Sequence, residues 1–374
     1  MSTLQVKVCT IDDVMPHPDP KVERLETVQV AGWSCVTQKG TFKRGDKCVY
    51  IPIDSVLPHT VEERLFPADA KIKLTKSRVK TIRIRGCVSQ GMCVPLTDLA
   101  PANTPVGKDL TETLGITKYE PPRKENSQTQ GRKQKRGENP HFRKFTDLEN
   151  VKWYPEVFAE GDEVVITEKI HGSNFRAGWV PFVPQTWWEK VKDWFGWNPL
   201  WEFVYGSRNV QLQRKDNPDT YYGTDVYGRV AKEYKLDTRI PKGHVFYGEI
   251  YGPSIQKGYH YGLKNDELGL VLFDAYDAME GHYWDYTLSR EFFEMSGLPT
   301  VPELYAGPFT KSTLDQYVTG NSVIHDSQKV REGVVIRPLN ESTSTCGRKI
   351  LKAINAEYLL SKHADEESPH DLVA

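Results

Sequence analysis

The 374-residue sequence has no uninterrupted apolar run of the roughly 18 or more residues that a membrane-spanning helix needs. Its first residues, MSTLQVKVCT, also lack the charged and then apolar layout of a secretory signal. The six cysteines include no C-x-x-C pair, so the sequence predicts neither a disulfide framework nor a zinc knuckle. We therefore expect an intracellular, cytoplasmic protein without a membrane partner.

The sequence also lacks a large excess of either charge, with 49 Lys and Arg against 50 Asp and Glu. The balance is nevertheless uneven, because residues 1–140 hold 23 basic and 16 acidic side chains, whereas residues 141–374 hold 26 and 34. A basic N-terminal part suits contact with a polyanion, and an acidic C-terminal part can keep carboxylates for chemistry or a metal. Two solvated surfaces would give the same counts, so charge alone does not decide between these interpretations.

A linker is predicted at residues 121–139, which have no aliphatic or aromatic side chain and carry six basic residues against two acidic ones. Before it, short alternating runs at 27–30, 48–53 and 79–85 predict an all-β, OB-like barrel over residues 1–120. After it, residues 140–362 are expected to form one mixed antiparallel α+β domain, followed by a tail at 363–374. The fold class is therefore α+β.

Within the C-terminal part, apolar runs predict strands and two periodic segments predict helices. The expected strands lie at residues 164–166, 244–250, 268–276, 333–337 and 349–354. The expected helices lie at 290–297 and 312–320. Because the helices do not alternate regularly with the strands, a mixed sheet fits better than a parallel winding.

The most informative motif is KIHGSN at residues 169–174, directly after the strand-like run EVVITE. A lysine at a strand end before a glycine turn can place its amine in a cleft, which makes Lys169 a candidate nucleophile. A free lysine has a pKa near 10.4, so a neutral amine at pH 7.5 requires that pKa to fall by about 3, or about 4 kcal/mol. Burial and nearby cations could supply this change, and we expect a lowered pKa.

Five further motifs follow Lys169 in order, namely GSRN at 206–209, FYGEIYG at 246–252, FD at 273–274, EGVVIR at 332–337 and LKAIN at 351–355. With this series the chain resembles the covalent nucleotidyltransferases, and within them the ATP-dependent RNA ligases of the phage RNA ligase 2 branch. His171 stands where DNA ligases and capping enzymes carry an aspartate. A basic β-barrel before the ligase-like core is similar to the Deinococcus- and Naegleria-type RNA ligases. The segment from Tyr251 to Tyr259 also resembles RNA ligases.

The resemblance implies roles for individual residues around ATP. Lys169 would form a covalent bond to AMP, Glu249 would contact the ribose, and Glu168 would also bind ATP. Lys352 would meet the α-phosphate, where a cation offsets charge in the transition state. His171 would lie near the leaving pyrophosphate, and Glu332 would bind Mg²⁺ or Mn²⁺, because carboxylate oxygens suit such ions.

Nucleic-acid contacts are expected in both halves of the chain. By resemblance, Asn174 and Arg208 would engage nucleic-acid phosphates, and a planar guanidinium suits this task. In the barrel, a basic run alternates with apolar residues and predicts a charged strand face, either for phosphates or simply solvated. The run consists of Lys71, Lys73, Lys76, Arg78, Lys80, Arg83 and Arg85, of which Arg78, Arg83 and Arg85 are the candidate contacts.

Two residues depart from the family pattern, and one further segment is unusual in composition. Ile354 replaces a second lysine of the last motif, so Lys352 acts alone unless Lys349 or Arg348 assists. Leu270 stands where an aromatic residue usually stacks on adenine, which suggests an aliphatic contact instead. Residues 180–203 hold five of the nine tryptophans, and we expect an amphipathic helical insertion packed on the core. A base-stacking platform or a partner surface remains the alternative for this insertion.

The sequence therefore predicts a monomeric ATP-dependent RNA ligase that seals 3′-OH and 5′-phosphate ends, at nicks or breaks in duplexes with an RNA 3′-OH strand, as in RNA repair. No G-x-x-x-x-G-K-[ST] loop is present, so ends must arrive already ligatable. Two alternatives stay open at this point: an ATP-dependent DNA or polynucleotide ligase, and a non-catalytic OB-type nucleic-acid-binding protein.

Overall fold

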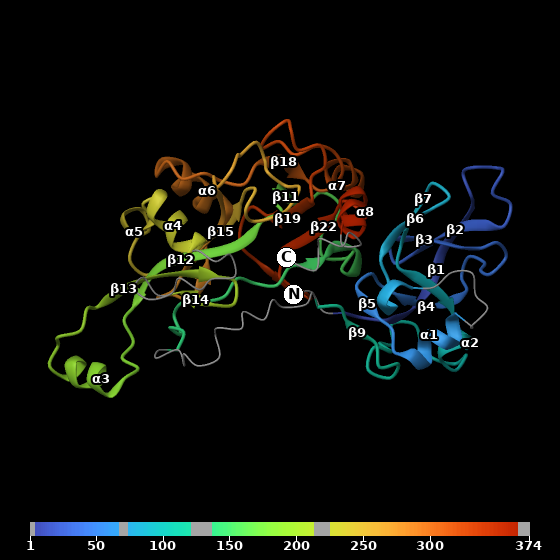
Figure 1. The fold of residues 1–374 in the computed structure, drawn as a ribbon, viewed down its shortest axis with the longest axis horizontal. Helices are drawn as coiled ribbons and strands as arrows, with labels where there is room; N and C mark the ends of the chain where they lie inside the picture. Colours follow the sequence, from blue (N-terminus) through green and yellow to red (C-terminus); the bar gives the residue numbers. More distant parts are fainter. Residues whose placement is uncertain (1–3, 67–73, 121–136, 213–224, 366–374) are drawn as a thin grey trace. The chain divides into compact units, whose positions relative to one another are not determined.

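The chain forms two compact units in the computed structural model, which describes residues 4–66, 74–120, 137–212 and 225–365 (Figure 1). One unit consists of Met1–Arg123, Glu149–Pro155 and Ala356–Ala374, and the other of Lys124–Leu148 and Glu156–Asn355. The linker predicted at 121–139 and the tail at 363–374 lie mostly outside the described residues. Within the described part, no helix is both long and apolar enough to cross a membrane.

The two compact units do not divide at one point of the chain, whereas residues 140–362 were expected to form one continuous domain. The segment Glu149–Pro155 belongs to the N-terminal unit, because the Lys152 ammonium lies 4.2 Å from the centroid of the Trp33 ring and Trp153 packs at 5.8 Å from Tyr50. The C-terminal helix α8 (Ala356–Asp365) belongs to the same unit, where Glu357 pairs with Arg83. Contacts between residues distant in sequence therefore set these boundaries.

The N-terminal unit is the predicted OB-like β-domain. Its main antiparallel sheet has the strand order β3-β2-β1-β4-β8. These strands are β1 (Lys7–Pro16), β2 (Leu25–Val30), β3 (Trp33–Gln38), β4 (Lys47–Ile51) and β8 (Met92–Pro95). The Val36 amide donates a hydrogen bond of 3.1 Å to the Ser89 hydroxyl on β7 (Cys87–Gln90), which brings the sheet close to closing.

Shorter elements complete this unit around a core that includes Val8, Val49 and Ile51. Strand β5 (Ser55–Val56) pairs with β9 (Thr117–Lys118), and β6 (Thr81–Ile84) pairs with β7. Helices α1 (His59–Leu65) and α2 (Leu96–Leu99) are short, and β10 (Glu149–Asn150) precedes a 3-10 turn. All six cysteines of the chain are free.

The expected basic strand over residues 71–85 is not one strand in the described part of the chain. A 3-10 turn at Thr75–Ser77 interrupts it, with Lys76 in the left-handed region at φ 54°, and residues 71–73 lie outside the described residues. Arg78 turns inward, is 5% exposed, pairs with Asp54 and stacks 3.6 Å from the Tyr119 ring centroid. Its side chain therefore holds the domain together and is not available for phosphate.

The C-terminal unit contains two antiparallel sheets. The first has the order β14-β13-β12-β15-β16-β17, and the second contains β22-β19-β11-β18 in that order. The bounds are β11 (Glu163–Lys169), β12 (Ser173–Pro181), β13 (Trp201–Ser207), β14 (Gln211–Leu212), β15 (His244–Tyr251), β16 (Gly269–Asp277), β17 (His282–Tyr283), β18 (Glu303–Pro308), β19 (Gly333–Pro338) and β22 (Leu351–Ile354), with the small hairpin β20 (Thr343–Ser344) and β21 (Gly347–Arg348). This is the predicted mixed antiparallel α+β architecture.

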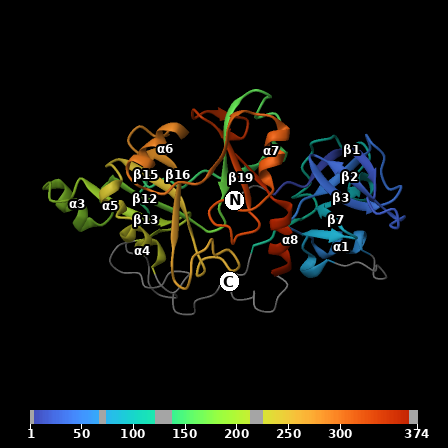
Figure 2. The same cartoon turned by 90° about the horizontal axis from the view of Figure 1, so that it is seen from above.

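Helices cover one face of the first sheet (Figures 1 and 2). Apolar side chains such as Phe246, Leu270 and Leu272 pack there against α4 (Val226–Glu233), α5 (Leu236–Arg239) and α6 (Tyr286–Met295). Helix α7 (Lys311–Val318) follows β18. The structure thus has α6 and α7 where periodicity predicts helices.

The other face of the first sheet turns toward the second sheet, and a buried ion network joins the two. Asp274 on β16 is fully buried and pairs with Arg337 of β19 at 3.2 Å and with Arg348 at 2.9 Å. Both arginines also pair with Glu341, so the four charges balance. A buried charge is stable only when it is paired in this way. The FD motif therefore has a structural function in fixing one sheet against the other.

The tryptophan-rich insertion does not pack on the core, contrary to our expectation. It forms helix α3 (Trp187–Trp194) beyond the ends of β12 and β13, and none of its residues is buried. The helix projects away from the sheets of its unit at the lower left of Figure 1. The predicted helix and its amphipathic pattern are thus confirmed, whereas the predicted packing partner is wrong.

Candidate functional site

The register of the second sheet places the two candidate lysines on one face. Lys169 ends β11 opposite Gly333 of β19, and Gly333 lies opposite Ile354 of β22. Lys352 lies opposite Val335, two residues further along β19. Because side chains alternate between faces along a strand, Lys169, Lys352 and Ile354 share a face. The strand order therefore gathers motifs that are almost 200 residues apart in sequence.

The Lys169 amine donates a hydrogen bond of 2.8 Å to Glu332 Oε1, and His171 Nδ1 lies 3.8 Å from Glu332 Oε2. Burial alone lowers the pKa of Lys169, but the charges of Glu332 and Glu249 and the bond to Glu332 outweigh it, so the pKa is raised. This reverses our expectation of a lowered pKa. The ion pair with Glu332 therefore favours the protonated ammonium of Lys169, the candidate nucleophile.

Glu249 faces this ion pair from the first sheet. It lies on β15 opposite Asn174 of β12 on one side and Val271 of β16 on the other. Burial raises the pKa of Glu249 to about 8, and the charge of Glu332 acts in the same direction. Lys169, Arg208 and a hydrogen bond from the Gly172 backbone partly oppose this rise. The site therefore combines acidic and basic groups under strong desolvation.

Leu270 does not face the site. It is fully buried in the core under the helices, together with Leu272 and Ile250. Val271 instead shares the face of Glu249, because these two residues are direct cross-strand partners. The aliphatic side chain on this face is therefore Val271 and not Leu270.

The loop that follows Lys169 is held by side chains that sequence analysis did not single out. The His171 amide donates a 2.8 Å hydrogen bond to the Tyr261 hydroxyl, and Gln256 Nε2 donates a 3.0 Å bond to the Gly172 carbonyl. The His171 ring packs edge-on against Tyr259 at 4.9 Å. Gln256 and Tyr259 belong to the segment that resembles RNA ligases, and Tyr261 lies just beyond it.

Two residues position the backbone of Glu332. The Asn355 amide donates a 2.9 Å hydrogen bond to the Glu332 carbonyl, and Asn355 Nδ2 donates to the Arg331 carbonyl at 3.2 Å. The Arg331 guanidinium donates to the Asn321 carbonyl. Asn355 closes the LKAIN motif, so its place in that motif was the signal that could have identified it.

Glu168 is fully buried next to Lys169 in sequence, and its side chain points to a different neighbour. Its Oε2 accepts a 2.8 Å hydrogen bond from the Val323 amide, whereas Oε1 has no hydrogen-bond partner among the described residues. Burial raises the pKa of Glu168, and the hydrogen bonds from Ser322 and Val323 oppose this effect.

The candidate nucleic-acid contacts lie in different surroundings. Arg208 follows β13, pairs with Asp147 and lies close enough to Glu249 to affect its pKa. In the N-terminal unit, Arg83 pairs with Glu357 at 2.7 Å, and Arg85 is an exposed turn residue with φ 50°. Arg208 is therefore part of the site, whereas Arg83 and Arg85 belong to the surface of the other unit.

Neither basic neighbour in the last motifs is placed to assist Lys352. Lys349 pairs with Asp162 at 2.7 Å and its ammonium lies 5.0 Å from the Phe158 ring centroid. Arg348 is committed to Asp274 and Glu341. Lys352 therefore lies on the face of Lys169, while Arg348 and Lys349 are engaged with other partners.

The donor set fits a divalent cation that is bound only partly by protein. Glu332 supplies carboxylate oxygens at the site, and such oxygens suit Mg²⁺ and Mn²⁺. Within the described ranges, no group of three or more His, Cys, Asp and Glu side chains could hold a metal ion. Mg²⁺ commonly keeps several water ligands and binds substrate oxygens, so a single protein carboxylate would be compatible with such an ion.

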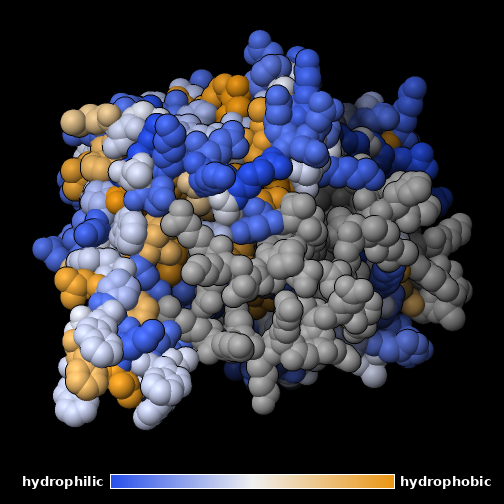
Figure 3. Space-filling view, turned by 60° about the vertical axis from the view of Figure 1, so that its left-hand side comes forward, coloured by the Kyte–Doolittle hydropathy of each residue, from blue (hydrophilic) through white to orange (hydrophobic). Residues whose placement is uncertain are grey.

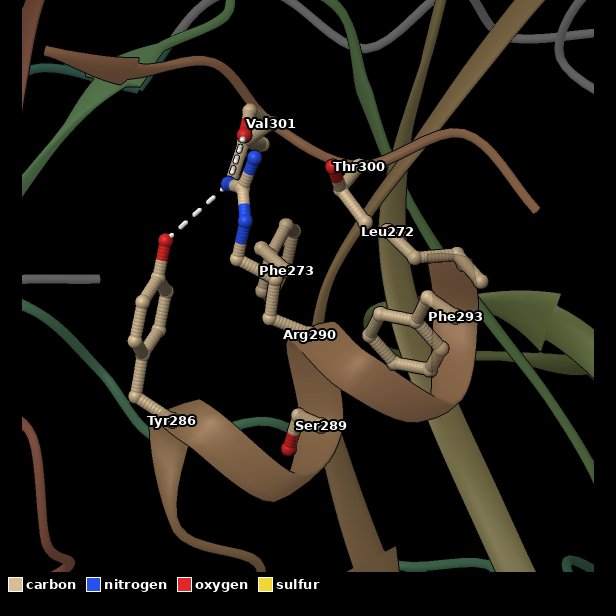
Figure 4. Close-up of a pocket in the computed structure, with 8 residues that line it drawn as sticks. All are labelled: Leu272, Phe273, Tyr286, Ser289, Arg290, Phe293, Thr300 and Val301. Carbon is tan, nitrogen blue, oxygen red and sulfur yellow. Dashed lines mark hydrogen bonds between the residues drawn. The ribbon is translucent and has the colours of Figure 1, made fainter. Parts of the chain in front are cut away.

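A pocket near α6 is separate from this site (Figure 4). It is lined mainly by Leu272, Phe273, Phe293 and Val301, and its one cation, Arg290, donates to the Tyr286 hydroxyl and the Val301 carbonyl. None of its lining residues is a candidate site residue.

Comparisons with known proteins identify the family and the fold of the chain. A family model for RNA ligase matches residues 162–354, and a model for an OB-fold domain matches residues 6–96. The search of curated proteins gives no match. Among solved structures, the Naegleria gruberi RNA ligase with pyrophosphate is 27% identical, with a TM-score of 0.70 over 97% of this chain and 99% of that one. Two mutants of that ligase also give TM-scores of 0.70. The mutant with ATP and Mn is 26% identical over 97% of this chain and 100% of that one. The mutant with AMP and Mn is 27% identical over 96% of this chain and 99% of that one.

Proposed function

We propose that this chain, which belongs to the RNA ligase family, joins RNA ends through a covalent lysyl-AMP and an adenylylated 5′ end. In the first step the Lys169 amine attacks the α-phosphorus of ATP and pyrophosphate leaves. In the second, a 5′-phosphate oxygen attacks the phosphorus of the lysyl-AMP, the P–N bond breaks, and the Lys169 amine leaves. In the third, a 3′-OH attacks the adenylylated end, and AMP leaves as the phosphodiester forms.

One observation carries this proposal: the Lys169 amine lies 2.8 Å from Glu332 Oε1. Lys169 shares its sheet face with Lys352, and Glu249 faces it from the other sheet. Solved N. gruberi ligase structures hold ATP and Mn, AMP and Mn, or pyrophosphate. ATP is the reactant and pyrophosphate the leaving group of such a first step, and AMP is the group that it transfers. The chain is accordingly an ATP-dependent RNA ligase that uses a divalent metal.

Lys169 has to lose a proton before it can attack. Its ion pair with Glu332 keeps it charged and oriented until substrate binds, and the incoming phosphates then compete for the same cation. Lys352 offsets the negative charge that develops on the α-phosphate oxygens. His171 is held by Tyr261 and Tyr259 and lies near Glu332. From this position it would contact the leaving pyrophosphate.

Recognition of the nucleotide is assigned to the facing sheet. Glu249 would hold the ribose, Val271 would lie against adenine, and the second oxygen of Glu168 would accept a bond from the base. Mg²⁺ or Mn²⁺ would bind Glu332 and substrate oxygens, and it would supply charge neutralisation for the phosphates.

The nucleic-acid substrate would extend from this site past Asn174 and Arg208. A guanidinium suits phosphate because it can form two parallel hydrogen bonds. In the N-terminal unit we retain Arg83 and Arg85 as candidate contacts and leave out the buried Arg78. The proposed substrate is a nick or break in a duplex, with an RNA strand on the 3′-OH side and a 5′-phosphate opposite.

The test begins with ATP labelled at the α-phosphate, Mg²⁺ or Mn²⁺, and the full-length protein. We predict a protein-bound label in wild type and none in Lys169→Ala, because the amine is the nucleophile. Lys169→Arg should be equally inactive, since a guanidinium stays protonated. The control is Lys349→Ala, which removes a lysine engaged elsewhere. A labelled Lys169→Ala protein would contradict the assignment.

A further inference from the structure

The exposed helix α3 has an apolar face that no part of the described chain covers. Trp187, Trp188, Val191, Trp194 and Phe195 recur at the spacing of one helix face, and we call them the α3 face. The helix is formed locally, because Thr186 and Glu189 make a reciprocal capping box at its start. It is therefore a built element and not an irregular loop.

The α3 face is strongly exposed for such large side chains. Trp187, Trp188 and Trp194 are 66%, 68% and 85% exposed, and Phe195 is 55% exposed. Just beyond the helix, Trp197 and Leu200 are 72% and 83% exposed. In Figure 3 the corresponding corner at the lower left shows pale and orange atoms projecting from the surface. A contiguous exposed apolar patch of this kind marks an interaction site.

The charges around this face do not suit a polyanion. The polar side of α3 carries Glu189 and Asp193 against Lys190 and Lys192, so it has no net charge. Nucleic-acid channels and anionic membrane surfaces both require a cationic excess. The aromatic face is therefore better matched to another apolar protein surface.

The residue pattern of the face is symmetric about Val191. Trp188 and Trp194 lie three residues to either side of it, and Trp187 and Phe195 lie four residues to either side. When two such helices pack antiparallel about a two-fold axis at Val191, Trp188 meets Trp194 of the other copy and Trp187 meets Phe195. A self-complementary patch of this kind is what a two-fold interface requires.

We propose that α3 pairs antiparallel with α3 of a second copy of this chain and thereby forms a homodimer. The area is sufficient, because the four exposed tryptophans expose roughly 700 Å² at about 250 Å² for a whole side chain. Phe195 and Leu200 add roughly 200 Å² at similar whole-side-chain areas, so the exposed area exceeds the roughly 800 Å² per partner that a standard stable interface buries. This inference does not depend on the ligase chemistry.

Sedimentation equilibrium of the full-length protein tests the dimer. Wild type should have twice the chain mass of 42.7 kDa in the micromolar range, and the Trp188→Ser/Trp194→Ser variant should have the mass of one chain. Met295→Ser is the matched control, because Met295 is 90% exposed on α6. Lysyl-AMP formation by all three proteins shows that each is folded.

Cross-linking tests the two-fold axis. Val191→Cys lies at the axis, so a bismaleimide that spans two packed helices, about 8–10 Å, should link two copies. Lys190→Cys on the polar side, and wild type with its native cysteines, should give only background. A wild type of single-chain mass, or no link through Val191→Cys, would overturn the proposal. If the tryptophan variant instead lost RNA binding or binding to neutral lipid vesicles without a change in mass, the face would serve that ligand.

Discussion

At the scale of single residues, the site depends on which partner each charge finds. Lys169 was identifiable from its strand end and its motif, but its partner Glu332 lies 163 residues away, so no local pattern reveals the ion pair. That pair changes the chemistry, because it raises a pKa that the sequence suggested would be lowered. The same holds for Arg78, whose inward turn toward Asp54 depends on a backbone turn at Lys76.

Glu332 and Lys352 should each be required for formation of lysyl-AMP. We predict that Glu332→Ala and Lys352→Ala slow single-turnover adenylylation by about 10² or more, the usual effect of removing one electrostatic contact to a transition state. Rapid quench with labelled ATP measures this rate. Lys349→Ala is the control, since Lys349 is paired with Asp162. Near-wild-type rates in both variants would show that these residues lie outside the reaction centre.

Glu249 should make the stability of the protein depend on pH. Its pKa of about 8 lies above the usual 4.5, so the folded state keeps a proton that the unfolded state releases in this window. Stability is therefore lost as pH rises from about 4.5 to 8. The Glu249→Gln side chain cannot ionise. The Tm of this variant minus that of wild type should therefore increase from pH 5 to 8 and then level off. Each kcal/mol of unfolding free energy corresponds to a Tm shift of about 2–4 °C.

Scanning fluorimetry without ATP or metal measures this difference. Glu291→Gln, the same substitution on the exposed side of α6, is the matched control. A constant difference for Glu249→Gln would mean that its carboxyl group is not desolvated in the folded protein.

At the scale of elements, alternation predicts where strands lie but not which side faces the site. The pairing of β15 with β16 shifts register between Tyr247 and Gly248, so Tyr247 lies opposite Asp274 while Gly248 lies opposite Leu272. The extra residue, Phe273, reverses the faces from there on. Counting back from the FD motif therefore gives Leu270, although Val271 is the residue beside Glu249.

Helix α3 shows the same separation between pattern and packing. Its periodicity and capping residues predict a helix with one apolar face, and the structure has that helix. The pattern contains no information on what covers the face. Packing on the core was the expected outcome for most such helices, whereas here the hairpin extends past the end of the sheet.

The turn after Lys169 should tolerate no side chain at Gly172. A Cβ there would lie 2.2 Å from the Ile250 carbonyl oxygen and 2.9 Å from Glu249 Cγ. Gly172→Ala should therefore displace the start of β12 from β15 and slow adenylylation by at least about tenfold, since a 1 Å displacement can cost about 10². Single-turnover labelling measures the loss, alongside Tm.

Gly137→Ala is the matched control, because its Cβ would first meet the Gln185 side chain at 3.4 Å. Equal rates for Gly172→Ala and wild type would mean that the loop can move without disturbing the nucleophile.

At the scale of the whole molecule, the sequence predicts two folds in the right order, and the matches to OB-fold and RNA ligase models confirm both. The boundary between the units was predicted less well, because Glu149–Pro155 and helix α8 lie with the N-terminal unit through contacts such as Trp153 with Tyr50. Trp153 and Tyr50 lie about a hundred positions apart in the sequence, and Glu357 of α8 lies 274 positions from its partner Arg83. Composition identifies a polar linker, but it cannot show which later segments return to the first unit.

Substrate choice is also a property of the whole molecule, because the strands to be joined extend well beyond the Lys169 site. The acceptor's 2′-OH is the group that distinguishes an RNA 3′ end from a DNA 3′ end at the junction. We therefore predict that sealing requires ribonucleotides on the 3′-OH side and tolerates either sugar on the 5′-phosphate side. The measurement is the rate at which full-length protein, with ATP and Mg²⁺ or Mn²⁺, seals nicked duplexes. Each strand of the duplex is exchanged in turn between RNA and DNA. Lysyl-AMP formation before addition of duplex controls for enzyme activity, and equal sealing of DNA and RNA 3′-OH ends would instead identify a general polynucleotide ligase.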